Sequence, residues 1–360
     1  MICFAWDGFP QYAARCIREF VRGTDESVFV VATKPTVPMK GMDAVCGCRV
    51  VWIEKSEQRT LCKMLGAIPR CIFIGGWGLN VFNRFRDEVR ASGGVTVCMC
   101  DNNYKFSLKE LIKSIRFRLL LRNKYDYYFV PGRSGVKLLR FYGVSGLRIK
   151  TNMYSADASL FRGGLPLDMR DKKIIYVGQF INRKNVLRLL EAFSKAAKAS
   201  TGGWELNLYG SGPLKCELLS RAQQENERLQ YAHCKIGIYD FVQPEQLSSL
   251  YQQARVFCLP SIEEHWGLVV HEAALSGCVL LLADSVGSAE DLLRKDELNK
   301  SIINGFVFNP RSVNSMARAI LRAMSMDAHE LKIANDASIE TAQTISTVNF
   351  ARNAKSFVTQ

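Results

Sequence analysis

The sequence has no apolar run long enough to cross a bilayer, so it predicts no membrane-spanning helix. It has no pair of Cys-x-x-Cys units and no His-x-x-x-His spacing, which argues against zinc, and we expect no metal. The Gly-x-Gly-x-x-Gly fingerprint is absent, which disfavours a nicotinamide dehydrogenase. Residues 1–7 read as a strand and not as a basic leader, so we expect no secretory signal.

The twelve cysteines are scattered along the 360 residues. Such cysteines are mostly small core residues in a reducing compartment, which predicts a cytoplasmic location. The formal net charge of +14 is uneven, because residues 1–160 hold 25 Lys and Arg against 13 Asp and Glu, whereas the rest hold 23 against 21. The cations of the first half are therefore either simply solvated or bind an anionic partner, such as nucleic acid, anionic lipid or a phosphorylated substrate.

Apolar runs alternate with amphipathic helical patterns, which predicts parallel sheets wrapped by helices. The length favours two domains. We therefore predict an α/β fold with two Rossmann-like, doubly wound parallel-sheet domains that face a central cleft. The expected strands are 2–6, 28–32, 49–53, 71–74, 95–100, 127–130, 173–177, 205–209, 235–238, 256–259 and 279–283, and the clearest helices are 11–21, 79–91, 186–198, 214–224, 246–253 and 269–275.

A Gly- and Pro-containing stretch, residues 161–166, separates the two halves and is the expected linker. We expect an N-terminal domain of residues 1–160, a C-terminal domain of residues 161–345, and a last helix over 346–360 that can pack back on the N-terminal domain. Doubly wound sheets bind ligands at the carboxyl ends of their strands. The active site is therefore expected in the cleft between the domains.

Residues 260–277 are the most informative segment of the chain. Two carboxylates, Glu264 and Glu272, bracket a Trp-Gly pair, and the second falls within the first turns of an apolar helix. A carboxylate at such a place would hold the hydroxyls of a sugar or a ribose. The alternative is a plain helix with acidic residues near its start, where they are favoured in any case.

The N-terminus of this helix is an expected anion site. Unpaired N–H groups and partial positive charge at a helix start suit a phosphate. Gly267, Leu268 and Val269 would offer those N–H groups.

Two other strand ends carry glycine turns. Gly178 and Gln179 follow one strand and precede Arg183 and Lys184, whose cations suit a diphosphate unless they are simply solvated at a helix start. Another strand ends at Gly210 in Gly-Ser-Gly-Pro, whose glycines let backbone approach a ligand. That motif alone is also an ordinary tight turn.

Together these segments resemble the retaining, two-domain glycosyltransferases of the GT-B fold and the family 4 type (glycosyl transferases group 1). The resemblance lies in the spacing of Glu264 and Glu272 around an aromatic-Gly pair, in the lysine after the first glycine turn, and in the small-residue loop 283–290. It spans residue 173 to the final helices. Over residues 1–150 the resemblance is mostly architectural.

The resemblance implies a role for each matching residue. Glu264 would contact the transferred sugar, Glu272 the nucleotide ribose, and Lys184 the donor diphosphate. Gln179 departs from the family, which usually has Arg there, and Arg183 would supply the missing cation. The implied catalytic residues are Glu264, Lys184 and Asp101, and the implied donor-binding residues are Glu272, Arg183, Gln179, Gly178, Gly210, Gly267, Leu268, Val269 and Gly8.

Gly8 and Asp101 belong to the half of the chain that matches less well. Gly8 follows the first strand, where the family often has a glycine pair near the donor phosphate. Asp101 ends a strand at which relatives often carry an acceptor-side His. It would orient an acceptor hydroxyl or merely cap the helix that begins near Ser107.

The activity that the resemblance implies is transfer of a hexose from a nucleotide diphosphate sugar to the hydroxyl of a glycan or lipid-linked acceptor, with retention of configuration, in cell-surface glycan or glycolipid assembly. No metal or other cofactor is expected, since cations and a helix N-terminus would stabilise the leaving group. We expect no nucleic-acid partner. Two alternatives stay open, a nucleotide-sugar epimerase of the same fold and a catalytically weakened sugar-nucleotide-binding subunit, the latter favoured by Gln179 and Ser288.

Residues 105–124 hold seven Lys and Arg, with five apolar residues at helical spacing. One interpretation is a basic amphipathic helix on an anionic membrane surface, which would make this a peripheral protein on the inner face of a membrane. The other is a core-facing stripe whose opposite face is solvated. The apolar residues are Leu108, Leu111, Ile112, Ile115 and Leu119.

Overall fold

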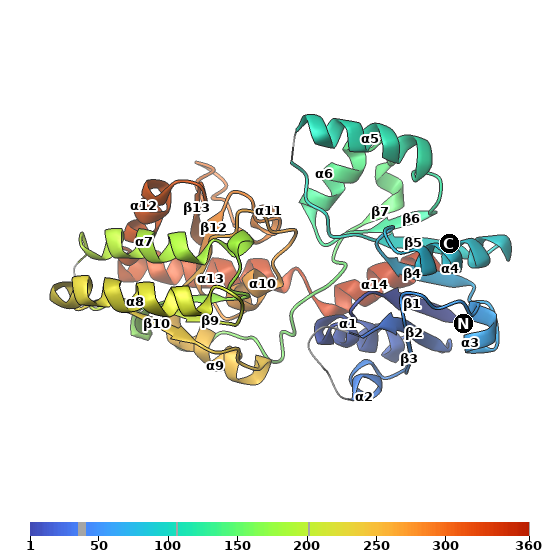
Figure 1. Cartoon of the computed structure of the whole chain (residues 1–360), viewed down its shortest axis with the longest axis horizontal. Helices are drawn as coiled ribbons and strands as arrows, with labels where there is room; N and C mark the ends of the chain where they lie inside the picture. Colours follow the sequence, from blue (N-terminus) through green and yellow to red (C-terminus); the bar gives the residue numbers. More distant parts are fainter. Residues whose placement is uncertain (35–40, 106, 201, 360) are drawn as a thin grey trace. The chain divides into compact units, whose positions relative to one another are not determined.

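The chain folds into two compact units (Figure 1). The first holds Met1–Asp157 together with Ile345–Gln360, and the second holds Ala158–Thr344. This is a computed structural model, and it describes residues 1–34, 41–105, 107–200 and 202–359.

The stretch expected as the linker, residues 161–166, lies inside the second unit. Phe161 is buried there and packs edge-on against Tyr251, with ring centroids 5.9 Å apart. The carbonyl of Leu165 accepts a hydrogen bond from Arg170 Nε at 2.6 Å. The chain therefore divides after Asp157, because the side chains that follow already belong to the second core.

The first unit is built on a seven-stranded parallel sheet in the order β3-β2-β1-β4-β5-β6-β7. Its strands are apolar runs because helices cover both faces of the sheet. The strands are β1 (Ile2–Trp6), β2 (Val28–Thr33), β3 (Arg49–Ile53), β4 (Cys71–Gly75), β5 (Val95–Met99), β6 (Tyr127–Phe129) and β7 (Ile149–Lys150). The α-helices are α1 (Gln11–Arg22), α2 (Met42–Cys46), α3 (Leu61–Leu65), α4 (Asn80–Ala91), α5 (Leu108–Leu120), α6 (Arg133–Phe141) and α14 (Thr347–Val358).

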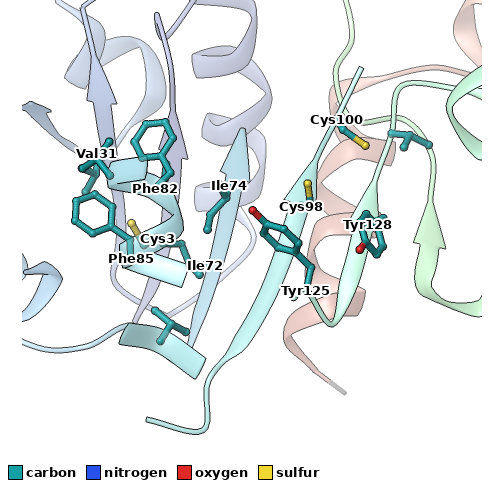
Figure 2. Packing of buried hydrophobic residues seen from close by; sticks show 14 of the residues in the cluster. Cys3, Val31, Ile72, Ile74, Phe82, Phe85, Cys98, Cys100, Tyr125 and Tyr128 are labelled. Carbon is teal, nitrogen blue, oxygen red and sulfur yellow. The ribbon is translucent and has the colours of Figure 1, made fainter. Parts of the chain in front are cut away.

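One face of this sheet packs against α4, whose Phe82 and Phe85 lie on the side of Cys3 and Ile72 in Figure 2. On the opposite face α14 supplies the packing: the ring of Phe350 lies 5.3 Å from that of Phe129, and the ring of Phe357 lies 6.1 Å from that of Phe73. The last helix of the chain is therefore part of the first core.

The second unit is built on a six-stranded parallel sheet in the order β10-β9-β8-β11-β12-β13. The strands are β8 (Asp171–Val177), β9 (Glu205–Tyr209), β10 (Lys235–Tyr239), β11 (Ala254–Leu259), β12 (Val279–Ala283) and β13 (Gly305–Phe308). The α-helices are α7 (Val186–Ala197), α8 (Lys215–Leu229), α9 (Pro244–Gln253), α10 (Leu268–Leu275), α11 (Ala289–Leu292), α12 (Val313–Met324) and α13 (Ala328–Gln343).

The predicted fold class, two Rossmann-like parallel-sheet α/β domains, is confirmed. All predicted strands occur, whereas β7 and β13 are not predicted from the sequence. The strand β7 has only two residues, and β13 begins with a glycine and is half-buried at its centre, so neither forms a continuous apolar run. Among the described residues no helix has the length and apolar character needed to cross a membrane.

Helix α5 exposes its apolar stripe to solvent. Leu108 and Leu119 are 81% and 79% exposed, whereas the buried side chains of the helix are Glu110, Ser114 and Phe117. The interpretation in which this stripe faces the core is therefore wrong. The helix instead turns a polar face toward α6, with hydrogen bonds that hold it there.

Candidate functional site

The sheet of the second unit places four loops at one edge. They follow β8, β9, β11 and β12, which run parallel, so their carboxyl ends lie together. The chain winds outward in both directions from β8 and β11, and this switch point is where doubly wound sheets bind ligands. The residues predicted for the second unit lie in or next to these loops.

Lys184 and Glu264 meet at this switch point. Lys184 closes a short 3₁₀ turn after β8, and its Nζ donates a hydrogen bond to Oε2 of Glu264 in the loop after β11. Each side chain is only 11% exposed. Ser261 Oγ donates to the same carboxylate oxygen at 3.2 Å, and a nitrogen of Arg183 lies 3.8 Å from it. The predicted diphosphate lysine and sugar carboxylate are thus side by side.

Backbone contacts hold the two loops together. The N–H of Ile262 donates to the carbonyl of Arg183 at 2.9 Å, and Arg183 donates through its guanidinium to the carbonyl of Glu263 at 2.7 Å. Asn185 Nδ2 donates to the carbonyls of Pro260 and Pro310 at 3.0 and 2.8 Å. Asn185 has φ of 60°, a left-handed conformation that asparagine tolerates better than most residues. Asn185 is buried, is the N-cap residue of α7, and supports the site through these two side-chain hydrogen bonds.

The loop after β12 completes the support of Glu264. The N–H of Gly287 donates to the carbonyl of Glu264 at 3.1 Å, and that of Ser288 donates to the carbonyl of Trp266 at 3.1 Å. Ser285 Oγ donates to the carbonyl of Ser261. The small-residue loop 283–290 therefore supports the loop that carries Glu264, and Ser288 does so through its backbone N–H.

Helix α10 starts at this edge. Gly267 is its N-cap residue with φ of 83°, and a Cβ there would lie 3.1 Å from Cγ of Glu264. The N–H of Val270 donates to the carbonyl of Gly267. Leu268 and Val269 are the first two residues of the helix, and in a regular α-helix the N–H groups at these positions have no intrahelical acceptor. The helix start thus lies directly beside Glu264 and carries partial positive charge.

The glycine turns after β8 and β9 lie against each other. A Cβ on Gly210 would overlap the carbonyl oxygen of Gly178, and the N–H of Phe180 donates to the carbonyl of Ser211 at 2.8 Å. Gln179 is exposed, and its carbonyl accepts the hydroxyl of Tyr176 at 2.9 Å. Burial and the nearby Glu264 raise the pKa of Tyr176, so its hydroxyl stays protonated and donates.

Glu272 projects from α10 beyond its first turn and is half-buried. The hydroxyl of Tyr251 on α9 donates to Oε2 of Glu272 at 3.2 Å. Burial first, and the charge of Glu272 second, raise the pKa of Tyr251 well above its ordinary value. The tyrosine therefore acts as a neutral donor that orients the carboxylate.

Three buried polar atoms beside the pair lack a hydrogen-bond partner among the described residues. They are Nδ1 of His265, Nε1 of Trp266 and Oγ of Ser288. An unsatisfied buried polar group is costly.

His271 is a packing residue, as its position on the apolar helix suggests. It is fully buried, and its Nε2 lies 2.9 Å from the carbonyl of Ala342, which can only accept. Burial lowers the pKa of His271 to about 4, against the opposing effect of that hydrogen bond. Over the described residues, no group of three or more His, Cys, Asp or Glu is arranged to hold a metal ion.

The first unit carries the remaining predicted residues. Asp101 is exposed just after β5 and accepts the hydroxyl of Tyr154 at 3.1 Å, whereas Ser107 caps α5, so the capping alternative for Asp101 is wrong. Gly8 has φ of 61°, and its N–H donates to Thr33 Oγ1 at 2.8 Å. That N–H would have to leave Thr33 to reach a phosphate.

Ser261, Asn185 and Tyr251 are site residues that sequence reasoning missed. Ser261 has a local signal, because it lies three residues before Glu264 at a strand end. Tyr251 has none, because its hydroxyl reaches α10 only in the folded unit. Asn185 follows Lys184 directly at a helix start, where Asn is a favoured residue.

Residues 158–339, about half of the chain, match the family described as glycosyl transferases group 1. This chain belongs to that family. The matched region contains every site residue described above in the second unit.

Curated relatives include an uncharacterized glycosyltransferase, MJ1607, of Methanocaldococcus jannaschii, which is 25% identical over 210 residues, covering 58% of this chain and 50% of that protein. The putative teichuronic acid biosynthesis glycosyltransferase TuaC of Bacillus subtilis is 26% identical over 274 residues, covering 75% and 58%. The sulfoquinovosyl transferase SQD2 of Arabidopsis thaliana is 28% identical over 170 residues, covering 47% and 30%. The chain thus spans about a third to somewhat over half the length of these relatives.

Solved structures resemble the whole chain. HepE of Anabaena, in complex with UDP and glucose, superposes with a TM-score of 0.73 at 14% identity, covering 100% of this chain and 99% of that one. Sucrose-phosphate synthase of Thermosynechococcus elongatus gives 0.71 at 16% identity, covering 100% and 99%. At these identities the likeness shows the fold alone.

Proposed function

We propose that this chain transfers a hexose from a nucleotide diphosphate sugar to an acceptor hydroxyl with retention of the anomeric configuration, as family 4 type enzymes do. The observation that carries the proposal is the pair of Lys184 and Glu264 beside the start of α10 at the switch point. Membership of the group 1 family supports glycosyl transfer as the reaction. A cell-surface glycan or glycolipid is the proposed product.

In this proposal the cations and the helix start bind the diphosphate. Lys184, Arg183 and the N–H groups of Leu268 and Val269 would share its charge, so that the leaving group needs no metal. Glu264 would exchange part of its contact with Lys184 for a hydroxyl of the sugar, and Glu272 would hold the ribose. The side chain of Arg183 is 40% exposed, so its guanidinium can turn toward a ligand.

The reaction exchanges one bond at the anomeric carbon for another. The acceptor oxygen bonds to that carbon from the face that the leaving group vacates, and the bond to the β-phosphate oxygen breaks. The nucleoside diphosphate leaves with both electrons and takes up the acceptor proton. Asp101 is proposed to orient the acceptor hydroxyl. Gly178, Gly210 and Gly8 are proposed to let backbone approach the donor.

Ligand-induced stabilisation tests the donor site. The melting temperature of the whole chain is measured with UDP, GDP, ADP, dTDP and their sugar conjugates. UDP and its sugars are tested first, because HepE of Anabaena was solved with UDP-glucose. One nucleotide series should raise the melting temperature, by an amount that corresponds to about 2.7 kcal/mol at 100 times its Kd. Glu272→Ala and Lys184→Ala should abolish most of that shift, whereas Glu297→Ala and Lys198→Ala, at exposed sites, should not.

Turnover separates the candidate functions. Transfer of labelled sugar to an acceptor extract, with a product that keeps the anomeric configuration by NMR, supports the proposal. Release of an isomerised sugar without acceptor supports the epimerase, and donor binding without any turnover supports the binding subunit. Wild-type turnover in Glu272→Ala or Lys184→Ala contradicts the site. The cytoplasmic location stays a prediction, which cell fractionation would test.

A further inference from the structure

Helix α5 is held to the first unit by its polar face. The Glu110 carboxylate accepts the hydroxyl of Tyr142, and Ser114 Oγ donates to the carbonyl of Phe141 at 3.1 Å. Arg118 donates to the same carbonyl at 2.7 Å. These bonds fix the rotation of the helix about its own axis.

Packing reinforces this orientation. The ring of Phe117 lies 4.9 Å from that of Tyr142 and 5.2 Å from that of Trp77, in the core cluster shared with β4, β5 and β6. Burial first, and Glu110 second, raise the pKa of Tyr142, which keeps its hydroxyl protonated as a donor. The buried face of α5 is therefore specified by one aromatic ring and a set of hydrogen bonds.

The outward face of α5 is apolar as a direct result. At about 100° per residue, the stripe lies opposite Glu110 and Phe117. Six of the 17 large apolar residues that are exposed in the described part of the chain lie on this one helix. Figure 1 shows α5 outside α6, at the periphery of the first unit. The stripe consists of Leu108, Leu111, Ile112, Ile115 and Leu119, and the exposed Leu120 lies beside it, on the side of Lys109 and Lys113.

Cations flank the stripe on both sides. At the same spacing Lys109, Lys113 and Arg116 lie along one side, where Lys113 also pairs with Glu110 at 3.2 Å, and Arg118 lies along the other. Residues 105–124 contain seven Lys and Arg and a single acid, Glu110, which is buried and bound to Tyr142. The exposed surface of the helix is thus apolar along its middle and purely cationic in charge along its margins.

A shallow pocket of about 340 Å³ opens at the end of α5. Leu119 and Leu120 form one side of it, and the remainder includes three cations, Arg90, Arg118 and Lys124, against the one carboxylate of Asp87. The pocket thus has apolar groups next to net positive charge. An anionic phospholipid, which has apolar chains next to a negative headgroup, is complementary to it.

We propose that α5 docks this protein on an anionic lipid surface, with the stripe in the acyl-headgroup boundary and the flanking cations on the headgroups. A second copy of the chain would meet the stripe with the same cations, whose repulsion disfavours that pairing. A bilayer with anionic headgroups satisfies both the apolar face and the charge. The inference does not depend on the proposed glycosyl transfer.

Vesicle co-sedimentation of the full chain tests this inference. Vesicles of phosphatidylcholine alone are compared with vesicles that also contain phosphatidylglycerol, at low and high salt and without nucleotide. The wild type should bind the anionic vesicles, with binding weakened by salt. The double variants Ile112→Ser with Leu119→Ser, and Lys109→Gln with Arg116→Gln, should each lose binding by about tenfold or more.

Matched controls lie in the second unit. Leu298→Ser removes a leucine that is 93% exposed, and Lys198→Gln with Lys332→Gln removes two exposed cations. Both should bind vesicles like the wild type. All altered side chains are exposed, so unchanged melting temperatures should accompany these results.

Three outcomes would overturn the inference. They are failure of the wild type to bind anionic vesicles, equal losses in the control variants, and a concentration-dependent dimer that Ile112→Ser with Leu119→Ser abolishes. Such a dimer would mean that a second copy of the chain covers the stripe. Analytical ultracentrifugation without lipid measures the oligomeric state. Nucleotide-induced stabilisation, measured in parallel, reports on the donor site separately.

Discussion

Nζ of Lys184 donates to Oε2 of Glu264, and this buried ion pair joins the loops that follow β8 and β11. Two residues 80 positions apart in the chain thus meet at the switch point of the second sheet. A charge that is taken out of water must keep its partner. The pair therefore has a structural role as well as its proposed role in donor binding.

We predict that Lys184→Ala destabilises the second unit by about 3–5 kcal/mol, because the buried carboxylate of Glu264 loses the ammonium group that donates to it. The double variant Lys184→Ala with Glu264→Gln should recover most of that loss, since no buried charge remains. Urea unfolding of the four proteins in the cycle measures the coupling. Losses that simply add would show that the pair does not contribute to stability.

We predict that Gly210→Ala separates the two glycine turns at a cost of about 1–3 kcal/mol or more, because its Cβ would overlap the carbonyl of Gly178. Donor-induced stabilisation should fall with it. Gly78→Ala is the control, since a Cβ there meets nothing within 4 Å. Equal melting temperatures of the two variants would contradict the close approach.

We predict that the stability of the second unit falls as the pH drops from about 6.5 toward 4. Burial lowers the pKa of His271 to about 4 from an ordinary value of 6.5, so between these values the unfolded chain binds a proton that the folded chain does not. The full effect is roughly 3 kcal/mol. In His271→Gln, whose amide can still donate to Ala342, urea midpoints should depend less on pH. The same slope in both proteins would exclude His271 as the cause.

We predict that Gln179→Arg tightens nucleotide diphosphate binding by about tenfold, because the side chain is exposed next to Gly178 and a charge-assisted hydrogen bond becomes available. The backbone carbonyl that Tyr176 uses is unchanged. Calorimetric titration compares this variant with Gln246→Arg, which adds the same charge at an exposed position of α9. A similar gain in both would indicate a general charge effect.

The α/β architecture was predictable because parallel strands buried on both faces form apolar runs, as in β1 and β12. The motifs proposed to bind the donor were also predictable, since each follows directly on such a strand. The contact between these motifs was not predictable, because Lys184 and Glu264 lie in loops that follow different strands, β8 and β11. The roles of individual site residues, including Asp101 and Gly8, stay predictions.

The sequence by itself determined where most strands, the main helices and the glycine turns occur, because local patterning sets these. Only the tertiary structure decided which face of α5 is buried. Its leucines and isoleucines have the spacing of a core-facing stripe, yet Glu110 and Ser114 bind Tyr142 and Phe141 more than 20 residues away. Those long-range hydrogen bonds turn the apolar stripe outward, and no local pattern encodes them.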